Sequence, residues 1–100
     1  MTYALVGDIP ASWDRYAGLV PLLRDAPNGL LLHVAGPTDE GFRIIEVWES
    51  EAAWRAFAVD RDAALALVDP DVAFRAVVRA LRPEHVVLGA AWQQREVAND

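Results

Sequence analysis

Two side chains that could move protons lie in consecutive strand-like segments. His33 is inside the apolar run LLLHVAG (30–36), and Glu46 is inside FRIIEVWE (42–49). An imidazole titrates near neutral pH, which suits a general base or acid. A carboxylate within a covered strand has to be paired or has to titrate at raised pH, and both states are common in functional clefts. His33 and Glu46 are therefore the candidate catalytic residues.

The hairpin between these segments decides whether the two residues meet. If TDEG (38–41) forms a four-residue loop, the antiparallel pairs are Phe42 with Pro37, Ile44 with Ala35, Glu46 with His33, and Trp48 with Leu31. A slip of one residue would put His33 and Glu46 on opposite faces and bury a charge. We expect the predicted register, in which the pair is either catalytic or a structural pair that closes a core.

Aromatic side chains could form the wall of a ligand pocket. Trp48 could stack on an aromatic ligand, and Trp54 and Phe57 are spaced i, i+3 on an expected helix. Tyr16 could present its hydroxyl to the same space. For Trp48, Trp54 and Phe57 the alternative role is ordinary core packing. Trp48, Trp54, Phe57 and Tyr16 are the predicted substrate-binding residues.

Composition limits the classes of function. The 100 residues suit one domain (1–100), with 54% hydrophobic and 24% charged residues. Nine arginines, without lysine, against fifteen acids give a net charge of −6, and no basic run exists, which argues against nucleic acid and anionic membranes as partners. The chain has no Cys, no apolar run long enough to span a membrane and no secretory signal pattern, so a cytoplasmic location is expected. The two His lack ligand-like spacing and no phosphate-binding loop occurs, so neither metal nor cofactor is expected.

The elements that must position these residues follow an α+β plan. We expect strands over 2–8, 30–36, 42–49 and 85–92. A helix begins at Ser12 and is interrupted near Pro21, a second is capped by Ser50, and a third is capped by Asp69 and ends before Pro83. Their apolar stripes comprise Tyr16, Leu19, Val20 and Leu23, then Ala53, Trp54, Phe57, Ala64, Leu65 and Val68, then Phe74, Val77, Val78 and Leu81. The order β-α-β-β-α-α-β predicts a ferredoxin-like βαββαβ fold with one extra helix and a four-stranded antiparallel sheet.

Both faces of this sheet read as apolar. The predicted register puts Leu30, Leu32, Val34, Ile45 and Val47 on one face, and Leu31, His33, Ala35, Ile44 and Trp48 on the other. Helices of a ferredoxin-like chain cover one face only, and the other would leave several hundred Å² of apolar surface exposed. The uniformly aliphatic face is therefore expected to form a homodimer with a second copy.

The sequence VWES followed by EAAWRAF (47–57), after GLLLHVAG (29–36) and the opening YALVGD and SWDRY segments, resembles the antibiotic biosynthesis monooxygenase-like superfamily. The resemblance covers most of residues 3–68 and implies a dimeric α+β barrel. It also implies a pocket between sheet and helices that Trp48 faces. Members include cofactor-free oxygenases of aromatic polyketides, haem-degrading enzymes and small cyclases. The haem-degrading branch uses a His on the second helix and an Asn on the first strand, and neither is present here.

Taken together, the residues and the resemblance predict a small cofactor-independent enzyme that acts on a hydrophobic, aromatic or polyketide-type metabolite. Monooxygenation and cyclisation both begin with removal of a proton, so the sequence does not separate them. The alternative is a non-catalytic ligand-binding or structural dimer. An open cavity of a few hundred Å³ beside His33 would favour the enzyme, whereas a filled one would favour the alternative.

Overall fold

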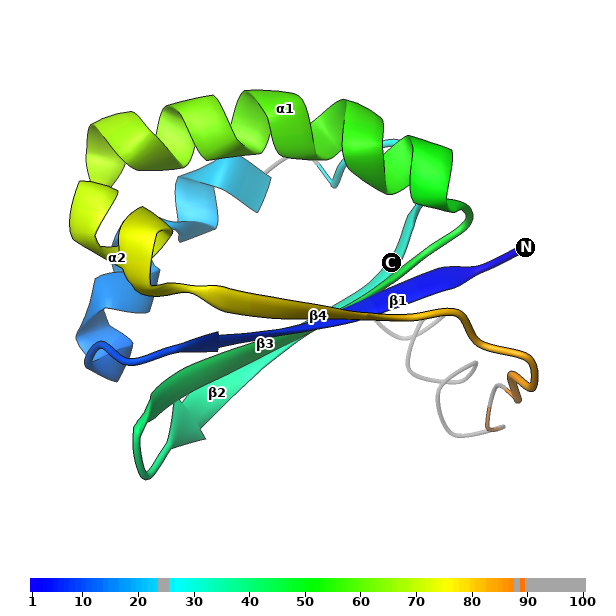
Figure 1. Cartoon of the computed structure of the whole chain (residues 1–100), viewed down its shortest axis with the longest axis horizontal. Helices are drawn as coiled ribbons and strands as arrows, with labels where there is room; N and C mark the ends of the chain where they lie inside the picture. The colour runs from blue at the N-terminus through cyan, green and yellow to red at the C-terminus, as the bar shows by residue number, and fades with distance from the viewer. Residues whose placement is uncertain (24–25, 88, 90–100) are drawn as a thin grey trace.

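The computed structural model describes residues 1–23, 26–87 and 89. Its elements are β1 (Tyr3–Ile9), the 3-10 helices η1 (Trp13–Gly18) and η2 (Val20–Leu23), β2 (Leu30–Thr38), β3 (Gly41–Trp48), α1 (Glu51–Val68), α2 (Pro70–Arg75) and β4 (Val77–Leu81). The four strands form one antiparallel sheet in the order β2-β3-β1-β4, and the helices lie over one of its faces (Figure 1). The predicted α+β, ferredoxin-like class is confirmed.

The β2–β3 hairpin has the predicted register at its centre. His33 pairs with Glu46, Ala35 with Ile44, and Pro37 with Phe42; Thr38 and Gly41 also pair, so the loop is shorter than predicted. The prediction was wrong at the far end, because a bulge between Leu30 and Leu32 pairs Trp48 with Leu30. The bulge moves Leu30 to the helix-covered face and leaves Leu31 48% exposed, since the extra residue reverses the alternation of side chains.

The segment after Ser12 forms two 3-10 helices where one α-helix was expected. The Ser12 hydroxyl does not cap a backbone N–H, and it donates to Asp14 Oδ1 at 2.5 Å instead. Gly18 disfavours a continuous helix, and Pro21 lacks the N–H that would bond four residues back. Leu19, between the two short helices, is nevertheless buried as predicted.

The long helix α1 begins where the sequence predicted. Ser50 accepts a hydrogen bond from the Ala53 N–H at 3.1 Å, the geometry of an N-cap. Ala53, Trp54 and Phe57 pack against the sheet, whereas Val68 is 55% exposed and was wrongly assigned to the buried face. The helix ends there because Asp69 starts α2, accepting a hydrogen bond from the Val72 N–H at 3.2 Å.

The last described strand comes earlier in the chain than predicted. The helix begun at Pro70 stops at Arg75, and Val77–Leu81 pair with β1 as β4. The predicted helical stripe through Leu81 was therefore wrong, because two adjacent β-branched valines also suit a strand and the free edge of β1 supplies hydrogen-bond partners. Of the strand expected over 85–92, residues 85–87 and 89 have no regular structure, and the rest lie outside the described residues.

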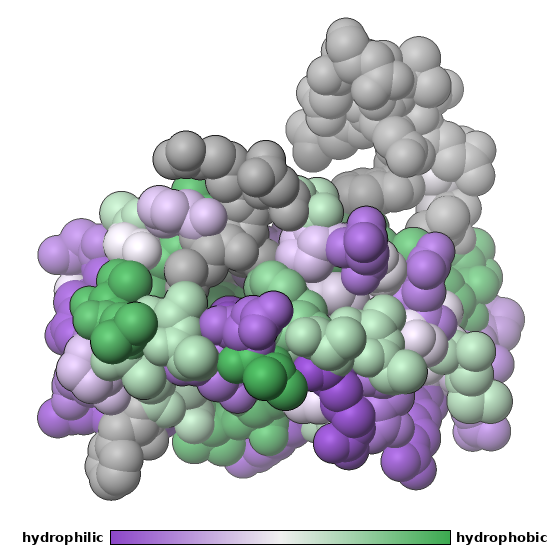
Figure 2. Space-filling model, turned by 90° about the horizontal axis from the view of Figure 1, so that it is seen from above, coloured by the Kyte–Doolittle hydropathy of each residue, from purple (hydrophilic) through white to green (hydrophobic). Residues whose placement is uncertain are grey.

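Two groups of buried side chains join the helices to the sheet. The first contains Ile9, Leu19, Phe42 and Val72. The second contains Tyr3, Leu5 and Trp48, against which Trp54 and Phe57 pack. Viewed from above, the helical side mixes hydrophobic and hydrophilic residues (Figure 2). Among the described residues, no helix is long and apolar enough to cross a membrane.

The sheet face that carries no described helix is rich in exposed apolar residues. Val34 is 48% exposed, Ile45 39% and Leu81 62%. They lie on β2, β3 and β4, and the pairing of Val34 with Ile45 makes two of them neighbours. Here the outer face means Val34, Ile45 and Leu81 with their apolar neighbours Ala4, Val6, Leu32, Val47 and Val77.

Candidate active site

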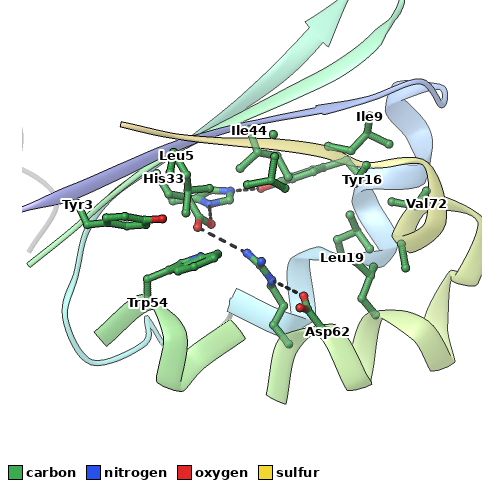
Figure 3. A pocket seen from close by; sticks show the side chains of 18 residues that line it. Tyr3, Leu5, Ile9, Tyr16, Leu19, His33, Ile44, Trp54, Asp62 and Val72 are labelled. Carbon is green, nitrogen blue, oxygen red and sulfur yellow. Dashed lines mark hydrogen bonds and ion pairs between the residues drawn. The ribbon is translucent and has the colours of Figure 1, made fainter. Parts of the chain in front are cut away.

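A cavity of about 560 Å³ lies between the sheet and the helices. Side chains from all four strands, η1, α1 and α2 line it, and His33 and Glu46 are among them (Figure 3). Tyr3 and Trp54 lie at one end, and Ile9, Leu19 and Val72 lie at the other. The cavity is therefore aromatic at one end and aliphatic at the other, with the predicted proton-transfer pair between them.

Glu46 is the one buried charged side chain among the described residues, with an exposed fraction of 1%. Its Oε2 accepts from His33 Nδ1 at 2.8 Å and its Oε1 accepts from Trp48 Nε1 at 3.1 Å. Burial by itself raises the pKa of Glu46, but the hydrogen bonds from His33 and Trp48 and the nearby Arg61 charge outweigh burial. The net pKa lies below its ordinary value, so Glu46 is an anion at neutral pH.

The imidazole of His33 bridges Glu46 and Tyr16. Its Nε2 lies 2.6 Å from the Tyr16 hydroxyl oxygen, and the His33 side chain is 16% exposed. Burial, followed by the Glu46 charge, raises the pKa of Tyr16, which keeps its hydroxyl protonated. An ionised Glu46 can only accept and a protonated Tyr16 can donate. With a neutral imidazole, the hydrogen bonds run from Tyr16 O–H to Nε2 and from Nδ1–H to Glu46.

The short helix η1 holds Tyr16 in this position. A 3-10 helix has three residues per turn, so side chains at i and i+3 lie one above the other. Trp13 stacks on Tyr16 with ring centroids 4.6 Å apart and an interplanar angle of 8°. Phe42 of β3 meets both rings edge-on, at 5.9 and 5.8 Å. An ion pair between Arg15 and Asp69 ties η1 to the junction of α1 and α2.

Arg61 is a residue of the cavity that the sequence interpretation missed. It projects from α1, and its Nη1 lies 3.6 Å from Glu46 Oε1. The predicted buried stripe of this helix passed from Phe57 to Ala64 and left Arg61 out. The available signal was spacing, because Arg61 follows Trp54 by seven residues and two helical turns return to nearly the same face.

The predicted binding residues divide between the cavity and the core. Tyr16 and Trp54 line the cavity, and Trp54 packs on Tyr3 with ring centroids 5.3 Å apart. Trp48 was expected to face the pocket, but its side chain is fully buried and bonds to Glu46. Phe57 packs against Trp48 at 5.3 Å and does not line the cavity. The Trp48 and Phe57 rings therefore belong to the core that packs behind the residues lining the cavity.

The polar groups at the cavity suit proton transfer. Throughout residues 1–23, 26–87 and 89, no three His, Asp or Glu side chains gather as metal ligands would. The carboxylate holds the imidazole in the tautomer whose Nε2 accepts a proton, as in other carboxylate–histidine pairs. Tyr16 occupies that nitrogen, so its hydroxyl can pass a proton from the cavity to His33. The hydrogen bonds thus form a chain that runs from Tyr16 through His33 to Glu46.

Comparison with solved structures identifies proteins of the same fold. Rv0793 from Mycobacterium tuberculosis is 14% identical, with a TM-score of 0.66 over 88% of this chain and 100% of that chain. A Caulobacter crescentus protein provisionally named antibiotic biosynthesis monooxygenase is 18% identical, with a TM-score of 0.64 over 84% and 91%. SnoaB, a cofactor-independent oxygenase from Streptomyces nogalater, is 12% identical, with a TM-score of 0.59 over 86% and 96%.

At these identities the likeness shows the fold, and at that level it confirms the resemblance seen in the sequence. Comparison with protein-family models and with curated protein sequences finds no significant match.

Proposed function

We propose that this protein is a cofactor-independent enzyme that removes a proton from a hydrophobic aromatic or polyketide-type metabolite and thereby starts its monooxygenation or cyclisation. The observation that carries the proposal is the open cavity of about 560 Å³ against the buried His33–Glu46 pair. A purely structural pair has no need of such a space beside it. The likeness to SnoaB, named as a cofactor-independent oxygenase, supports the same class of reaction.

This chain of hydrogen bonds, acting as a proton relay, supplies the base that both reactions require. A phenolic or activated C–H proton of the ligand passes to the Tyr16 oxygen as the Tyr16 proton passes to His33 Nε2. Glu46, 2.8 Å from Nδ1, stabilises the imidazolium that forms. The carbanion then attacks a carbonyl carbon in a cyclisation. With dioxygen it forms a peroxide anion, which takes the proton back from the His33 imidazolium. The hydroperoxide then loses water as its remaining C–H proton leaves, so that a CH₂ group becomes a carbonyl.

The aromatic end of the cavity suits a flat ligand. Tyr3 and Trp54 present ring surfaces there, and aromatic side chains favour stacked or edge-on contacts with further rings. The aliphatic end, with Leu19 and Val72, suits the apolar remainder of the same molecule. Closing such a site around the ligand excludes water and shields a reactive carbanion.

The experiment is incubation of the purified protein with polycyclic phenols under air and without added cofactor, followed by thermal shift and product mass. A mass gain of one oxygen less two hydrogens indicates monooxygenation, and loss of water or an isomer indicates cyclisation. Raised melting temperature without any product from the whole panel would favour the non-catalytic alternative. The absence of both binding and product would refute the proposal.

We further propose that the outer face pairs with the same face of a second copy. Exposed Val34, Ile45 and Leu81 make much of this face apolar. The Asp8–Arg43 ion pair lies at one end of the face and Arg79 on its β4 edge. Apolar patches on a monomer mark interaction surfaces. A twofold arrangement would cover the face with itself. The cavities open on the other side of each sheet, so dimerisation leaves them accessible.

A further inference from the structure

The cavity wall contains a cationic side chain, Arg61, without a short hydrogen bond to any residue that the structure describes. Arg61 has a side-chain exposure of 19%, and its two ion-pair contacts are 3.6 Å to Glu46 Oε1 and 3.5 Å to Asp62 Oδ1. Both exceed the ordinary N–H···O range of about 2.7–3.2 Å. Trp54 Nε1 is buried and has no hydrogen-bond partner in the part of the chain that the structure describes. Arg61 and Trp54 both line the cavity.

These two residues share one face of α1. They are seven positions apart, which places Arg61 two turns beyond Trp54 on the side toward the sheet. The Arg61 guanidinium lies over the Phe57 ring at 5.6 Å, which fixes its direction from the helix. The guanidinium, partly covered and without a short hydrogen bond to its two carboxylate neighbours, has N–H groups left to donate to an oxygen that enters the cavity.

We infer that Arg61, beside the Trp54 ring, forms a binding subsite for a ligand oxygen that becomes negatively charged, a phenolate or enolate oxygen. The inference rests on the proposed function, because it says which side chain stabilises the negative charge that remains on the ligand after the relay removes its proton. It names the substrate class more narrowly, as a molecule in which a hydroxyl or carbonyl oxygen is conjugated to the acidic position.

The charges balance through the step. Before proton transfer, Arg61 is a cation 3.6 Å from Glu46, and the relay requires a neutral His33. When the ligand gives up its proton through Tyr16, the imidazolium becomes the close partner of Glu46 at 2.8 Å. Arg61 is then free to pair with the anionic ligand oxygen. Glu46 is then paired with the imidazolium and Arg61 with the ligand oxygen, while Asp62, 69% exposed, stays beside Arg61.

Among the described residues, Arg61 is the one cationic side chain at the cavity wall, which makes the inference testable by substitution. The probe is alizarin, a dihydroxyanthraquinone whose visible spectrum differs between its phenol and phenolate forms. The variants are Arg61→Gln, which removes the charge, and Arg61→Lys, which keeps it. The control is Arg82→Gln, because Arg82 has a side-chain exposure of 75% and lies away from the cavity.

The wild-type protein and Arg82→Gln are expected to bind alizarin largely as phenolate at neutral pH. Arg61→Gln should lower the bound phenolate-to-phenol ratio about tenfold or more, and Arg61→Lys should restore part of it. Trp54→Phe keeps a ring and removes only an N–H that does not reach the cavity surface, so it should leave the phenolate-to-phenol ratio unchanged. Circular dichroism of each variant checks that it is folded.

The outcomes separate the two proposals. An unchanged phenolate ratio in folded Arg61→Gln would overturn the subsite while leaving the relay in place. If the wild-type protein and every variant bound alizarin mainly as phenol, the subsite would also be overturned. Failure of alizarin to bind even the wild-type protein would count against the proposed function itself, and the subsite would fall with it.

Discussion

Replacing Glu46 by Gln should remove turnover while leaving the protein folded. The amide can satisfy the surrounding groups in one orientation, with Oε1 accepting from Trp48 Nε1 and the NH₂ donating to His33 Nδ1. The proton of the imidazole then moves to Nε2, which donates to the Tyr16 oxygen. Every hydrogen bond survives, but the relay now points the wrong way to accept a proton.

The magnitudes follow from these contacts. The hydrogen bonds from His33 and Trp48 to a charged carboxylate become bonds with a neutral amide, which lowers the free energy of unfolding by about 1 kcal/mol each. Burying a neutral amide costs less than burying a carboxylate, and this offsets part of the loss. The net destabilisation is about 1–2 kcal/mol, or about 5–15 °C in melting temperature for a domain of this size. Such domains have about 5–15 kcal/mol of stability, so the fold persists. Loss of a general base lowers kcat by about 10²–10⁴-fold.

The assay combines thermal melting with product formation from whichever phenol the wild-type protein converts. The control is Glu49→Gln, the same change at an exposed position next to the end of β3 and outside this cavity. It should match the wild-type protein in both measurements. A folded Glu46→Gln protein with full turnover would refute the reasoning, because it would show that the carboxylate does not set the direction of the relay.

Four further outcomes are expected. Tyr16→Phe should still bind ligand but lose most turnover, measured by product mass. If the pair is merely structural, His33→Leu with Glu46→Leu should melt no lower than wild type and retain ligand binding. The folded state holds the pKa of Glu46 below 4.5, so the ionised carboxylate stabilises the fold fully above that pH, and this stabilisation is lost as the pH falls through the folded pKa. The melting temperature of Glu46→Gln should therefore lack this part of the fall in acid. Ile45→Asp should convert a dimer to a monomer in light scattering, and a wild-type monomer at micromolar concentration would contradict the outer-face proposal.

The centre of the site could be predicted from the sequence because local rules and burial agreed there. The TDEG loop and the cost of burying one charge without its partner both favoured the pairing of His33 with Glu46. The same reasoning failed for the partner of Trp48, because residue types do not predict the bulge at Leu31. Trp48 keeps its predicted face, but Phe57 packs against it there, so it supports Glu46 from the core and does not line the cavity.

The last strand and the Tyr16 contact show where sequence reasoning ends. Val77 and Val78 fit a helical stripe and a strand equally well, and the free edge of β1 decides between them. The hydroxyl of Tyr16 reaches His33 only because η1 is a 3-10 helix held by Trp13 and Phe42. These outcomes depend on tertiary contacts between segments far apart in the chain.

The most direct test of the relay is the protonation of His33 with and without ligand, measured by ¹⁵N NMR of the imidazole nitrogens. In the free protein we predict one proton, on Nδ1, with Nε2 unprotonated and hydrogen-bonded to Tyr16. On saturation with a phenolic ligand whose spectrum reports the phenolate, both nitrogens should carry protons. An imidazole that stays neutral beside a bound phenolate would contradict the account, because the ligand proton would then have gone elsewhere.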